Sequence, residues 1–364
     1  MSGTSMDAVD ACVVRFVDDR LDLIRYQQFP FAGGLAAALN AIGPHSSLDE
    51  TFRLHAILGL EFAEAALGVM KLCGIEARDV AAIGCHGQTV LHRPSANPPF
   101  TVQLGDPNRV AWRTRIMTIA DFRGMDIAAG GQGAPLAPAF HAQCFARESA
   151  PRVVVNIGGI ANISVLPPAG RKDVSGFDTG PGNTLMDLWA RQHHGEPFDA
   201  EGRWARTGRP DPGLLRHLLE DPYFGAAPPK STGRDLFNMD WLRDRGSSRL
   251  AALKPEDVQA TLLELTGETI AAAIERNAAD IDEVVICGGG ARNLYLLERL
   301  SSRLARRRVF TSEELGIDPD SVEACMIAWL AKLRLNAECV DLTGITGASK
   351  PAVLGSIYMT GGEG

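Results

Sequence analysis

The chain has 364 residues, of which 45% are hydrophobic and 22% are charged, and its net charge is −8 at pH 7. This length and composition predict a globular protein of two domains, and a basic run confined to residues 303–308 argues against a nucleic-acid partner. Seven scattered cysteines without a CxxC pair exclude a zinc site of that kind and indicate a reducing compartment. Because we find neither a signal segment nor an apolar run of about eighteen residues, we expect a cytoplasmic protein without a membrane partner.

The first ten residues, MSGTSMDAVD, are mostly small or polar. Gly3, Thr4 and Ser5 combine a flexible backbone with two hydroxyl groups, which suits the binding of phosphates and of the hydrated magnesium that accompanies them. The alternative is a disordered N-terminal tail. Residues 8–16 and 21–29 are predicted strands that form a hairpin.

A long helix and a buried strand are predicted next. Ser47 and Glu50 form a capping box, and the apolar period that follows predicts an amphipathic helix ending near Gly74. Residues 80–84 are predicted to form a buried strand that leads into Cys85-His86-Gly87-Gln88-Thr89. Ligands collect at the carboxyl ends of strands in α/β folds, so His86 is a candidate for substrate contact. A purely structural histidine is the alternative.

Two further strands, at residues 100–104 and 116–120, precede a glycine-rich bend at 129–135 and a helix at 136–146. The second strand ends in Asp121-Phe122-Arg123. Arg123 could clamp a carboxylate, because a guanidinium group matches that geometry with two parallel hydrogen bonds. A surface ion pair with Asp121 or Asp126 is the alternative.

Residues 152–187 are the most informative stretch. A strand at Val153–Val155 turns on Asn156-Ile157-Gly158-Gly159 and returns as a strand at 160–166, and glycines at such a turn let the backbone approach an anion. Asp178 then lies on a glycine-rich bend just before a predicted helix start at Thr184, where backbone N–H groups favour negative charge. A phosphate cradle beside a carboxylate base is what phosphoryl transfer requires. An ordinary hairpin and loop remain the alternative.

The C-terminal third contains a third glycine turn. A helix at 255–276 precedes a short strand at 284–286, which runs into Cys287-Gly288-Gly289-Gly290 and another helix; this is a geometry for approaching a nucleotide. No Walker lysine motif occurs. The last long helix is predicted to start at Asp318-Pro319, and Glu323, at the border of its apolar stripe, could point into a cleft.

Three glycine-rich turns that follow or join strands resemble the phosphate and adenosine turns of the actin, hexokinase and chaperone ATPase superfamily. The closest resemblance is to the anhydro-N-acetylmuramic acid kinase family, and it covers essentially the whole chain. The motifs that carry it, besides the helix of Glu323, are MSGTSMDAVD, IGCHGQTVLHRP, GGQGAPLAP, VNIGGIANIS, GFDTGPGN and CGGGARN.

The resemblance implies a kinase of cell-wall recycling that hydrolyses the 1,6-anhydro bridge of anhydro-N-acetylmuramic acid and phosphorylates the product with ATP and Mg²⁺ to N-acetylmuramate 6-phosphate. It implies that Asp178 is the general base, that Glu323 binds the sugar and, on weaker grounds, that Arg123 meets the lactyl carboxylate. The segment from Gly3 to Asp10 would bind ATP, and two turns, Asn156 to Gly159 and Gly288 to Gly290, would line the nucleotide cleft. The implied nucleotide-binding residues are Gly3, Thr4, Ser5, Met6, Asp7, Ala8, Val9, Asp10, Asn156, Gly158, Gly159, Gly288, Gly289 and Gly290.

The expected fold is α/β, with two ribonuclease-H-like domains facing each other across an ATP cleft. Residues 1–146 would form the first domain, with 321–364 returning to it, and 147–320 would form the second. The partners would be ATP and an amino sugar, and a homodimer stays open. Two rival readings are another small-molecule or acetate-type kinase on this fold and an actin-like ATPase without catalytic function.

The chain departs from the family pattern at two places. Ala8 stands where the family usually has the last glycine of GTSMDG, which we expect to be tolerated if its φ is negative. The family also has an apolar strand ahead of MSGTS, and this chain begins without it. We expect the first sheet to lack that strand, with an earlier start codon as the explanation.

Overall fold

The computed structural model describes residues 1–3, 8–18, 20–43, 46–171, 173–233 and 235–361. The chain forms two compact units. The first contains residues 1–140 and 321–364, and the second contains residues 141–320. Each unit is described by itself below.

The first unit begins with the predicted hairpin. Strands β1 (Ala8–Val17) and β2 (Arg20–Pro30) pair antiparallel, with Val17 opposite Arg20 at the turn. The register shifts by one residue between Val13 and Val14, which marks a β-bulge. Both predicted strands are therefore confirmed.

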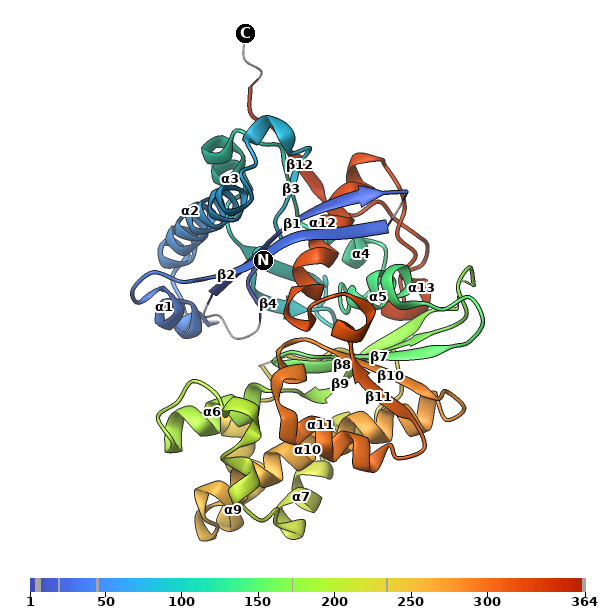
Figure 1. The fold of residues 1–364 in the computed structure, drawn as a ribbon. Helices are drawn as coiled ribbons and strands as arrows, with labels where there is room; N and C mark the ends of the chain where they lie inside the picture. Colours follow the sequence, from blue (N-terminus) through green and yellow to red (C-terminus); the bar gives the residue numbers. More distant parts are fainter. Residues whose placement is uncertain (4–7, 19, 44–45, 172, 234, 362–364) are drawn as a thin grey trace. The chain divides into compact units, whose positions relative to one another are not determined.

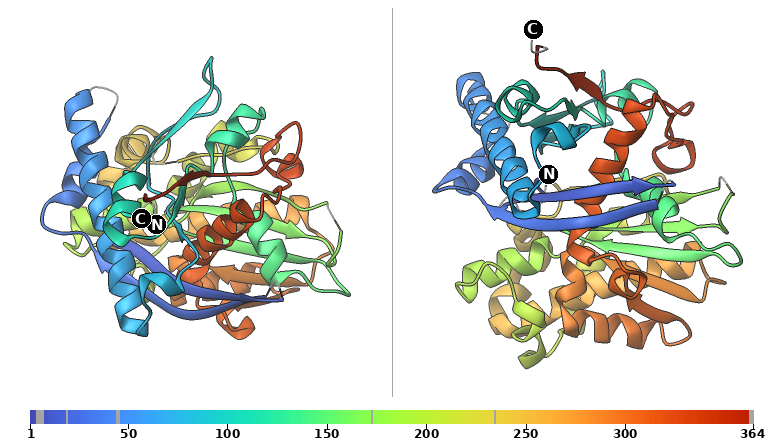
Figure 2. Two further views of the ribbon diagram at one scale, coloured as in Figure 1. Left: turned by 90° about the horizontal axis from the view of Figure 1, so that it is seen from above. Right: turned by 45° about the horizontal axis from the view of Figure 1, so that its top comes forward.

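Helix α2 (Leu48–Cys73) covers this hairpin (Figures 1 and 2). The predicted capping box is present, because the Ser47 side chain accepts a hydrogen bond from the Glu50 amide and the Glu50 carboxylate accepts one from the Ser47 amide. Gly74 ends the helix at φ 67°, a left-handed conformation that favours glycine. Apolar side chains of the helix pack against Val9 of β1 and Leu104 in a core cluster that includes Leu54, Leu58 and Phe62.

Three short strands form the second sheet of this unit. Their order is β12 (Ser356–Tyr358), β6 (Thr118–Ala120) and β3 (Ile83–Gly84), with β3 parallel and β12 antiparallel to β6. The strand predicted at 80–84 shrinks to two residues, because β3 has a paired neighbour on one side only within the described chain. A hairpin of β4 (Gln88–Arg93) and β5 (Phe100–Leu104) follows, and its first strand was not predicted.

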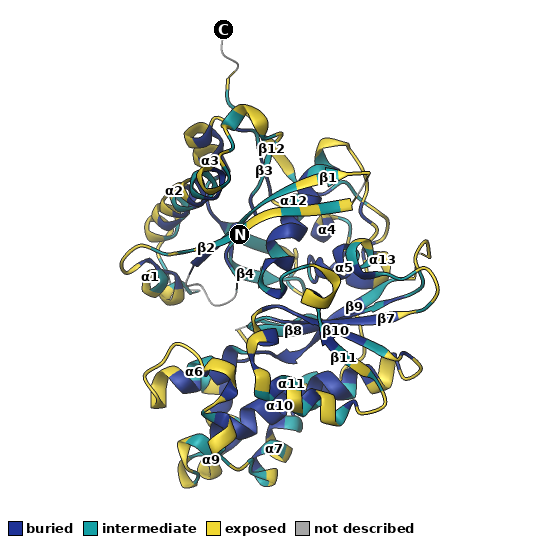
Figure 3. Cartoon of the chain, in the orientation of Figure 1, coloured by how far each residue is buried: buried dark blue, intermediate teal, exposed yellow. Residues whose placement is uncertain are grey.

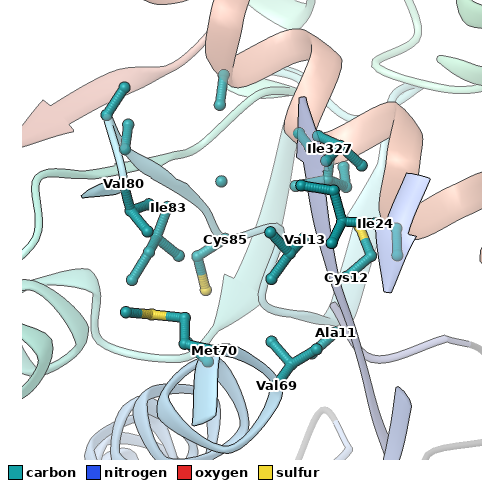
Figure 4. A pocket seen from close by; sticks show the side chains of 18 of the residues that line it. Ala11, Cys12, Val13, Ile24, Val69, Met70, Val80, Ile83, Cys85 and Ile327 are labelled. Carbon is teal, nitrogen blue, oxygen red and sulfur yellow. The ribbon is translucent and has the colours of Figure 1, made fainter. Parts of the chain in front are cut away.

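An apolar cavity of about 460 Å³ lies between β1 and β3 (Figure 4). Residues 11–14 of β1 line it and are only partly buried, although they are mostly apolar. At one end of it the Met1 amino group donates to the Asp10 carbonyl at 2.6 Å, and the Asp10 amide donates to the Met1 carbonyl at 2.8 Å. These reciprocal bonds are those of an antiparallel pair, so chain added before Met1 would continue along the edge of β1 into the cavity.

The second unit is built on a five-stranded sheet with the order β11-β10-β7-β8-β9. Strands β7, β8 and β9 are successive antiparallel neighbours, and β10 and β11 run parallel to β7, which is the ribonuclease-H-like arrangement. The strand bounds are β7 (Arg152–Ile157), β8 (Ile160–Leu166), β9 (Ser175–Pro181), β10 (Glu283–Cys287) and β11 (Arg308–Thr311). Val153, Val154 and Val155 are fully buried, as expected for a central strand covered on both faces (Figure 3).

Two helices, α10 (Pro255–Asn277) and α11 (Leu294–Arg303), lie against this sheet (Figure 1). The helix predicted at 255–276 is therefore confirmed, and its buried side includes Val258, Leu262 and Leu265. The other helices of the unit are α6 (Thr184–His193), α7 (Pro212–Leu219), α8 (Pro222–Gly225) and α9 (Met239–Ala252).

The last long helix, α12 (Val322–Leu335), begins later than predicted. Pro319 starts a separate 3₁₀ turn over Pro319–Ser321, and the α-helical hydrogen bonding begins only at Val322. The prediction of a helix start at Asp318-Pro319 was therefore wrong by one turn. The remaining helices are α1 (Leu35–Ala41), α3 (Pro107–Thr114), α4 (Gly124–Ala128), α5 (Ala137–Phe145) and α13 (Thr343–Thr346).

The cavity beside β1 predicts that an added apolar strand stabilises the protein. Six valine or isoleucine residues placed directly before Met1 would lie opposite Ala11–Phe16, the six residues of β1 beyond Asp10 that line the cavity. We expect the melting temperature to rise by several degrees, since ~1 kcal/mol shifts it by ~2–4 °C in domains of this size. Calorimetry compares the melting temperature of this variant with that of a matched variant that carries six glycine and serine residues at the same place. Equal melting temperatures would show that the cavity does not accept a strand.

Candidate active site

The N-terminal candidates are only partly described. Thr4, Ser5, Met6 and Asp7 lie outside the described residues. A Cβ atom added to Gly3 would lie 4.0 Å from Oε2 of Glu323, so a nucleotide candidate and the sugar candidate are neighbours in the first unit. Glu323 is itself half-buried between the buried Val322 and Ala324 of α12.

The other N-terminal candidates belong to β1. Ala8 and Val9 are buried, and Ala8 belongs to β1, whose extended backbone an alanine adopts without strain, so alanine fits where the family usually has glycine. The Asp10 carboxylate accepts hydrogen bonds from the Tyr26 hydroxyl at 2.6 Å and from the Gln28 amide at 3.2 Å. The side chains of Ala8 and Val9 thus serve the core, and that of Asp10 is engaged with the neighbouring strand.

His86 and Arg123 contact each other directly. Nε of Arg123 donates to Nε2 of His86 at 2.9 Å, and Nδ1 of His86 lies 2.9 Å from the Gly87 carbonyl. Because an arginine can only donate, Nε2 must accept, and the ring proton lies on Nδ1. Burial, and then the charge of Arg123, lower the pKa of His86 to about 3, so the ring is neutral at physiological pH. The histidine orients the arginine, and both of its ring nitrogens are engaged within the protein.

Arg123 is also tied to the glycine-rich bend. Its Nη1 donates to the Gly133 carbonyl at 2.7 Å, and the Gly133 amide donates to the Asp126 carboxylate at 2.6 Å. Asp126 accepts a second bond, from the Thr346 hydroxyl, at 2.8 Å. A continuous hydrogen-bonded chain therefore links the C-terminal segment to His86 through the predicted candidate Arg123.

In the second unit, the turn after β7 contacts the segment that precedes α6. The Asn183 amide donates to the Gly158 carbonyl at 2.8 Å, and the Gly182 and Thr184 amides donate to the Gly159 carbonyl at 2.9 and 3.1 Å. A Cβ atom on Gly182 would come within 2.2 Å of the Gly158 carbonyl oxygen. Only glycine permits this approach of two backbones.

The structure brings the third glycine turn to the same edge of the sheet. Gly288 has φ 79°, and a Cβ atom there would lie 2.4 Å from Oδ1 of Asn156. A Cβ atom on Gly290 would lie 2.3 Å from the Ile157 side chain. The two turns thus form one rim at the carboxyl ends of β7 and β10, although 130 residues separate them in the sequence. We call it the glycine rim, and it contains the candidates Asn156, Gly158, Gly159 and Gly288 to Gly290.

Gly158 and Gly289 have more space around them than Gly288 and Gly290. The nearest atom to a Cβ on Gly158 would be 3.5 Å away, and the nearest to one on Gly289 would be 3.9 Å away. Neither position is crowded by protein, so the missing side chains leave backbone that a phosphate can approach.

Asp178 lies in the interior of β9, only 6% exposed. The prediction that it sits on a bend at a helix start was wrong, because β9 continues to Pro181 and α6 begins at Thr184. Three hydrogen bonds, and not the N-terminus of a helix, hold Asp178 in position. Oδ2 accepts from the Thr232 amide at 2.9 Å, the Asp178 amide donates to the Lys230 carbonyl at 3.2 Å, and the Asp178 carbonyl accepts from the Tyr223 hydroxyl at 2.7 Å.

Tyr223, Lys230 and Thr232 were not predicted. Burial, and then the negative charge of Asp178, raise the pKa of Tyr223, so its hydroxyl stays protonated and donates. The Lys230 ammonium in turn donates to the Tyr223 carbonyl at 3.0 Å. The only sequence signal for these residues is the proline-rich segment Pro228-Pro229-Lys230-Ser231-Thr232 between two helices.

A buried polar chain runs behind the rim. Nδ1 of His141 lies 2.7 Å from Oγ of Ser164, its Nε2 lies 3.9 Å from Sγ of Cys287, and that thiol is 3.8 Å from Oδ1 of Asn156. Burial lowers the pKa of His141 to about 3. The chain of contacts orients the Asn156 side chain without placing a charge in the core.

The described residues contain no group of three or more histidine, cysteine, aspartate or glutamate side chains that could hold a metal ion. None of the helices that could be searched has the length and hydropathy of a membrane span.

The model of the anhydro-N-acetylmuramic acid kinase family matches residues 1–360. The chain belongs to this family.

Its relatives within the family are similar over nearly their whole length. Anhydro-N-acetylmuramic acid kinase of Xanthomonas axonopodis pv. citri is 47% identical, over 98% of this chain and 96% of that protein. The enzyme of the same name from Vibrio cholerae is 45% identical with the same coverage. Among solved structures, the activator of the 2-hydroxyisocaproyl-CoA dehydratase from Clostridium difficile with bound ADPNP has a TM-score of 0.43 and 11% identity, covering 92% of this chain and 100% of that one. A likeness of that size carries no functional argument.

The buried histidines predict how stability depends on pH. The pKa of His141 is about 3 in the folded protein and near its ordinary value of 6.5 in the unfolded chain. Between these values the unfolded chain binds a proton that the folded protein does not, so the free energy of unfolding falls as pH falls from about 6.5. We expect the urea midpoint of His141→Asn to fall less between pH 7 and pH 5 than that of the unsubstituted protein.

The matched control is His217→Asn, at an exposed position on α7. It should leave the fall in the midpoint unchanged. An unchanged fall in His141→Asn would mean that this ring does not gain its proton on unfolding.

Proposed function

We propose that the protein is an ATP-dependent kinase that hydrolyses the 1,6-anhydro bridge of anhydro-N-acetylmuramic acid and forms N-acetylmuramate 6-phosphate, in cytoplasmic recycling of cell-wall sugars. Membership of the family supports the substrate. The chemistry is supported by Asp178, a buried carboxylate that the Thr232 amide orients. Asp178 belongs to the sheet in which β7 and β10 end at the glycine rim.

ATP would be held by two sets of residues. The segment from Gly3 to Asp10 would bind phosphates from the first unit. In the second unit, Gly158 and Gly289 offer uncrowded backbone to phosphates, and Gly288 and Gly290 keep the turn close to Asn156 and Ile157 respectively. Mg²⁺ would reach the site with ATP, since this ion is usually held by substrate phosphates and one or two carboxylates. It would neutralise charge on the phosphates.

Asp178 would act as general base toward a water molecule. The sixth oxygen of the sugar is part of the ether bridge, so it has no proton for a base to remove. Water adds to the anomeric carbon and its proton goes to Asp178, while the bond between that carbon and the sixth oxygen breaks. The sixth oxygen takes the γ-phosphoryl group, and ADP leaves. General-base catalysis contributes roughly 10²–10⁴-fold to such a rate.

The sugar would be recognised by residues of the first unit. Glu323 would accept hydrogen bonds from sugar hydroxyl groups. Arg123, held in place by His86 and Gly133, would pair with the lactyl carboxylate. His86 would act through Arg123, because both of its ring nitrogens already have partners.

Asp178→Asn tests the base, because the amide keeps the shape of the side chain and cannot take a proton from water. We expect turnover to fall by roughly 10²–10⁴-fold, while calorimetric titration shows unchanged ATP binding. Asp173→Asn, at an exposed position just before β9, is the matched control and should keep full turnover.

The origin of the added oxygen is followed in the same assay. In heavy-oxygen water the label should enter the anomeric position and stay out of the phosphate ester, provided that the product is reduced at once to prevent exchange. Label in the phosphoryl group, or near-normal turnover of Asp178→Asn, contradicts the mechanism.

Tyr223→Phe tests whether the hydrogen bond to the Asp178 carbonyl positions the base. Loss of one such bond costs ~0.5–1.5 kcal/mol, so we expect kcat to fall roughly 2–10-fold. The dissociation constant for ATP should not change. Tyr295→Phe, on α11 with its ring against Arg206, is the control. A fall in stability with kcat unchanged would make Tyr223 a purely structural residue.

A further inference from the structure

A second cavity, of about 250 Å³, lies within the second unit. Strand β9 contributes Phe177 and Thr179, the two neighbours of Asp178, and helix α10 contributes Ala272 and Ala273. The remaining wall is formed mainly by Phe224 and Gly225 of α8 and, after that helix, by Ala226, Ala227, Pro228 and Lys230. Most of these lining side chains are apolar.

Two cations, Lys230 and Arg276, also line this cavity. The Lys230 ammonium donates to the Tyr223 carbonyl at 3.0 Å, and Nη1 of Arg276 donates to the Phe224 carbonyl at 3.2 Å. Among the described residues, neither cation forms an ion pair with a carboxylate. Burial first, and the positive charge of Arg276 second, lower the pKa of Lys230, whereas the charge of Asp178 acts in the opposite direction. The two cations are therefore close enough to repel each other.

Arg276 is an exposed residue, whereas Lys230 is half-buried against neutral groups. The Lys230 ammonium lies 4.6 Å from the centre of the Tyr223 ring and 5.7 Å from that of Phe177. Arg276 is in the last turn of α10, where the free carbonyl groups carry partial negative charge. An anion between the two cations would pair with both and remove their repulsion.

We propose that this cavity binds a small organic anion with an apolar tail, with a carboxylate between Lys230 and Arg276 and the tail against Phe177 and Phe224. The volume of the cavity is that of roughly eight water molecules at ~30 Å³ each. It therefore suits a monocarboxylate of about eight non-hydrogen atoms, well below the usual size of a drug-like ligand.

Such a ligand would contact residues that hold the base of the proposed function. The Lys230 carbonyl accepts a hydrogen bond from the Asp178 amide, and Phe177 and Thr179 flank Asp178 in β9. This consequence rests on the proposed function, whereas the binding itself does not. Binding is therefore measured without turnover.

Titration calorimetry of the full chain with hexanoate tests the proposal. We expect saturable binding of one hexanoate, and weaker or no binding of hexylamine, hexanol and inorganic phosphate. Arg276→Met should weaken hexanoate binding ~10-fold or more, as expected for the loss of a charged hydrogen bond. Ala272→Leu should abolish binding by filling the cavity, whereas Arg216→Met, at an exposed position on α7, should leave it unchanged.

Thermal melts followed by circular dichroism are used to check that each variant is folded. No binding of hexanoate overturns the proposal, and so does full binding by a folded Arg276→Met together with a folded Ala272→Leu. Equal binding of hexylamine would show that the cavity selects only for apolar ligands. Equal binding of phosphate would show that it selects only for charge, and either result is likewise against the proposal.

Discussion

The geometry of the second unit depends on the contact between two backbones, at Gly158-Gly159 and at Gly182 to Thr184. Three amide-to-carbonyl hydrogen bonds join these segments, and a Cβ atom on Gly182 would come within 2.2 Å of the opposite carbonyl. The contact fixes where β9 ends and where α6 starts. It thereby places Asp178, four residues before Gly182, at a constant position relative to the glycine rim at the ends of β7 and β10.

Desolvation decides which of the buried polar groups carry charge. His86 and His141 are buried and have a pKa of about 3, so both are neutral and act through hydrogen bonds alone. Asp126 is buried as well, and burial raises its pKa, although it accepts bonds from the Gly133 amide and the Thr346 hydroxyl. Neutral histidines cost less to bury than charged ones, which lets them orient Arg123 and Asn156 from within the core.

Hydrogen bonds also join motifs that are far apart in the sequence. In the first unit, the chain from Thr346 through Asp126, Gly133 and Arg123 ends at His86, and its first bond spans 220 residues. In the second unit, the bond from Thr232 to Asp178 spans 54 residues. In the first unit, residues of GGQGAPLAP and IGCHGQTVLHRP thus both contact Arg123. In the second unit, Asp178 of GFDTGPGN is positioned by Thr232, which lies outside the family motifs.

The sequence by itself determined features whose causes lie within a few residues of chain. The capping box of Ser47 and Glu50, the strands on either side of Gly158 and the long helix ending at Asn277 follow from local hydrogen bonds and apolar period. The glycine turns and the candidate Asp178 were visible for the same reason. Tertiary structure decided the rest. The surroundings of Asp178 depend on Tyr223, Lys230 and Thr232, and β3 is short because a strand forms only where a neighbour supplies hydrogen bonds. The paired cations beside Phe177 likewise meet only after folding, because α10 and the segment after α8 are brought together by the core.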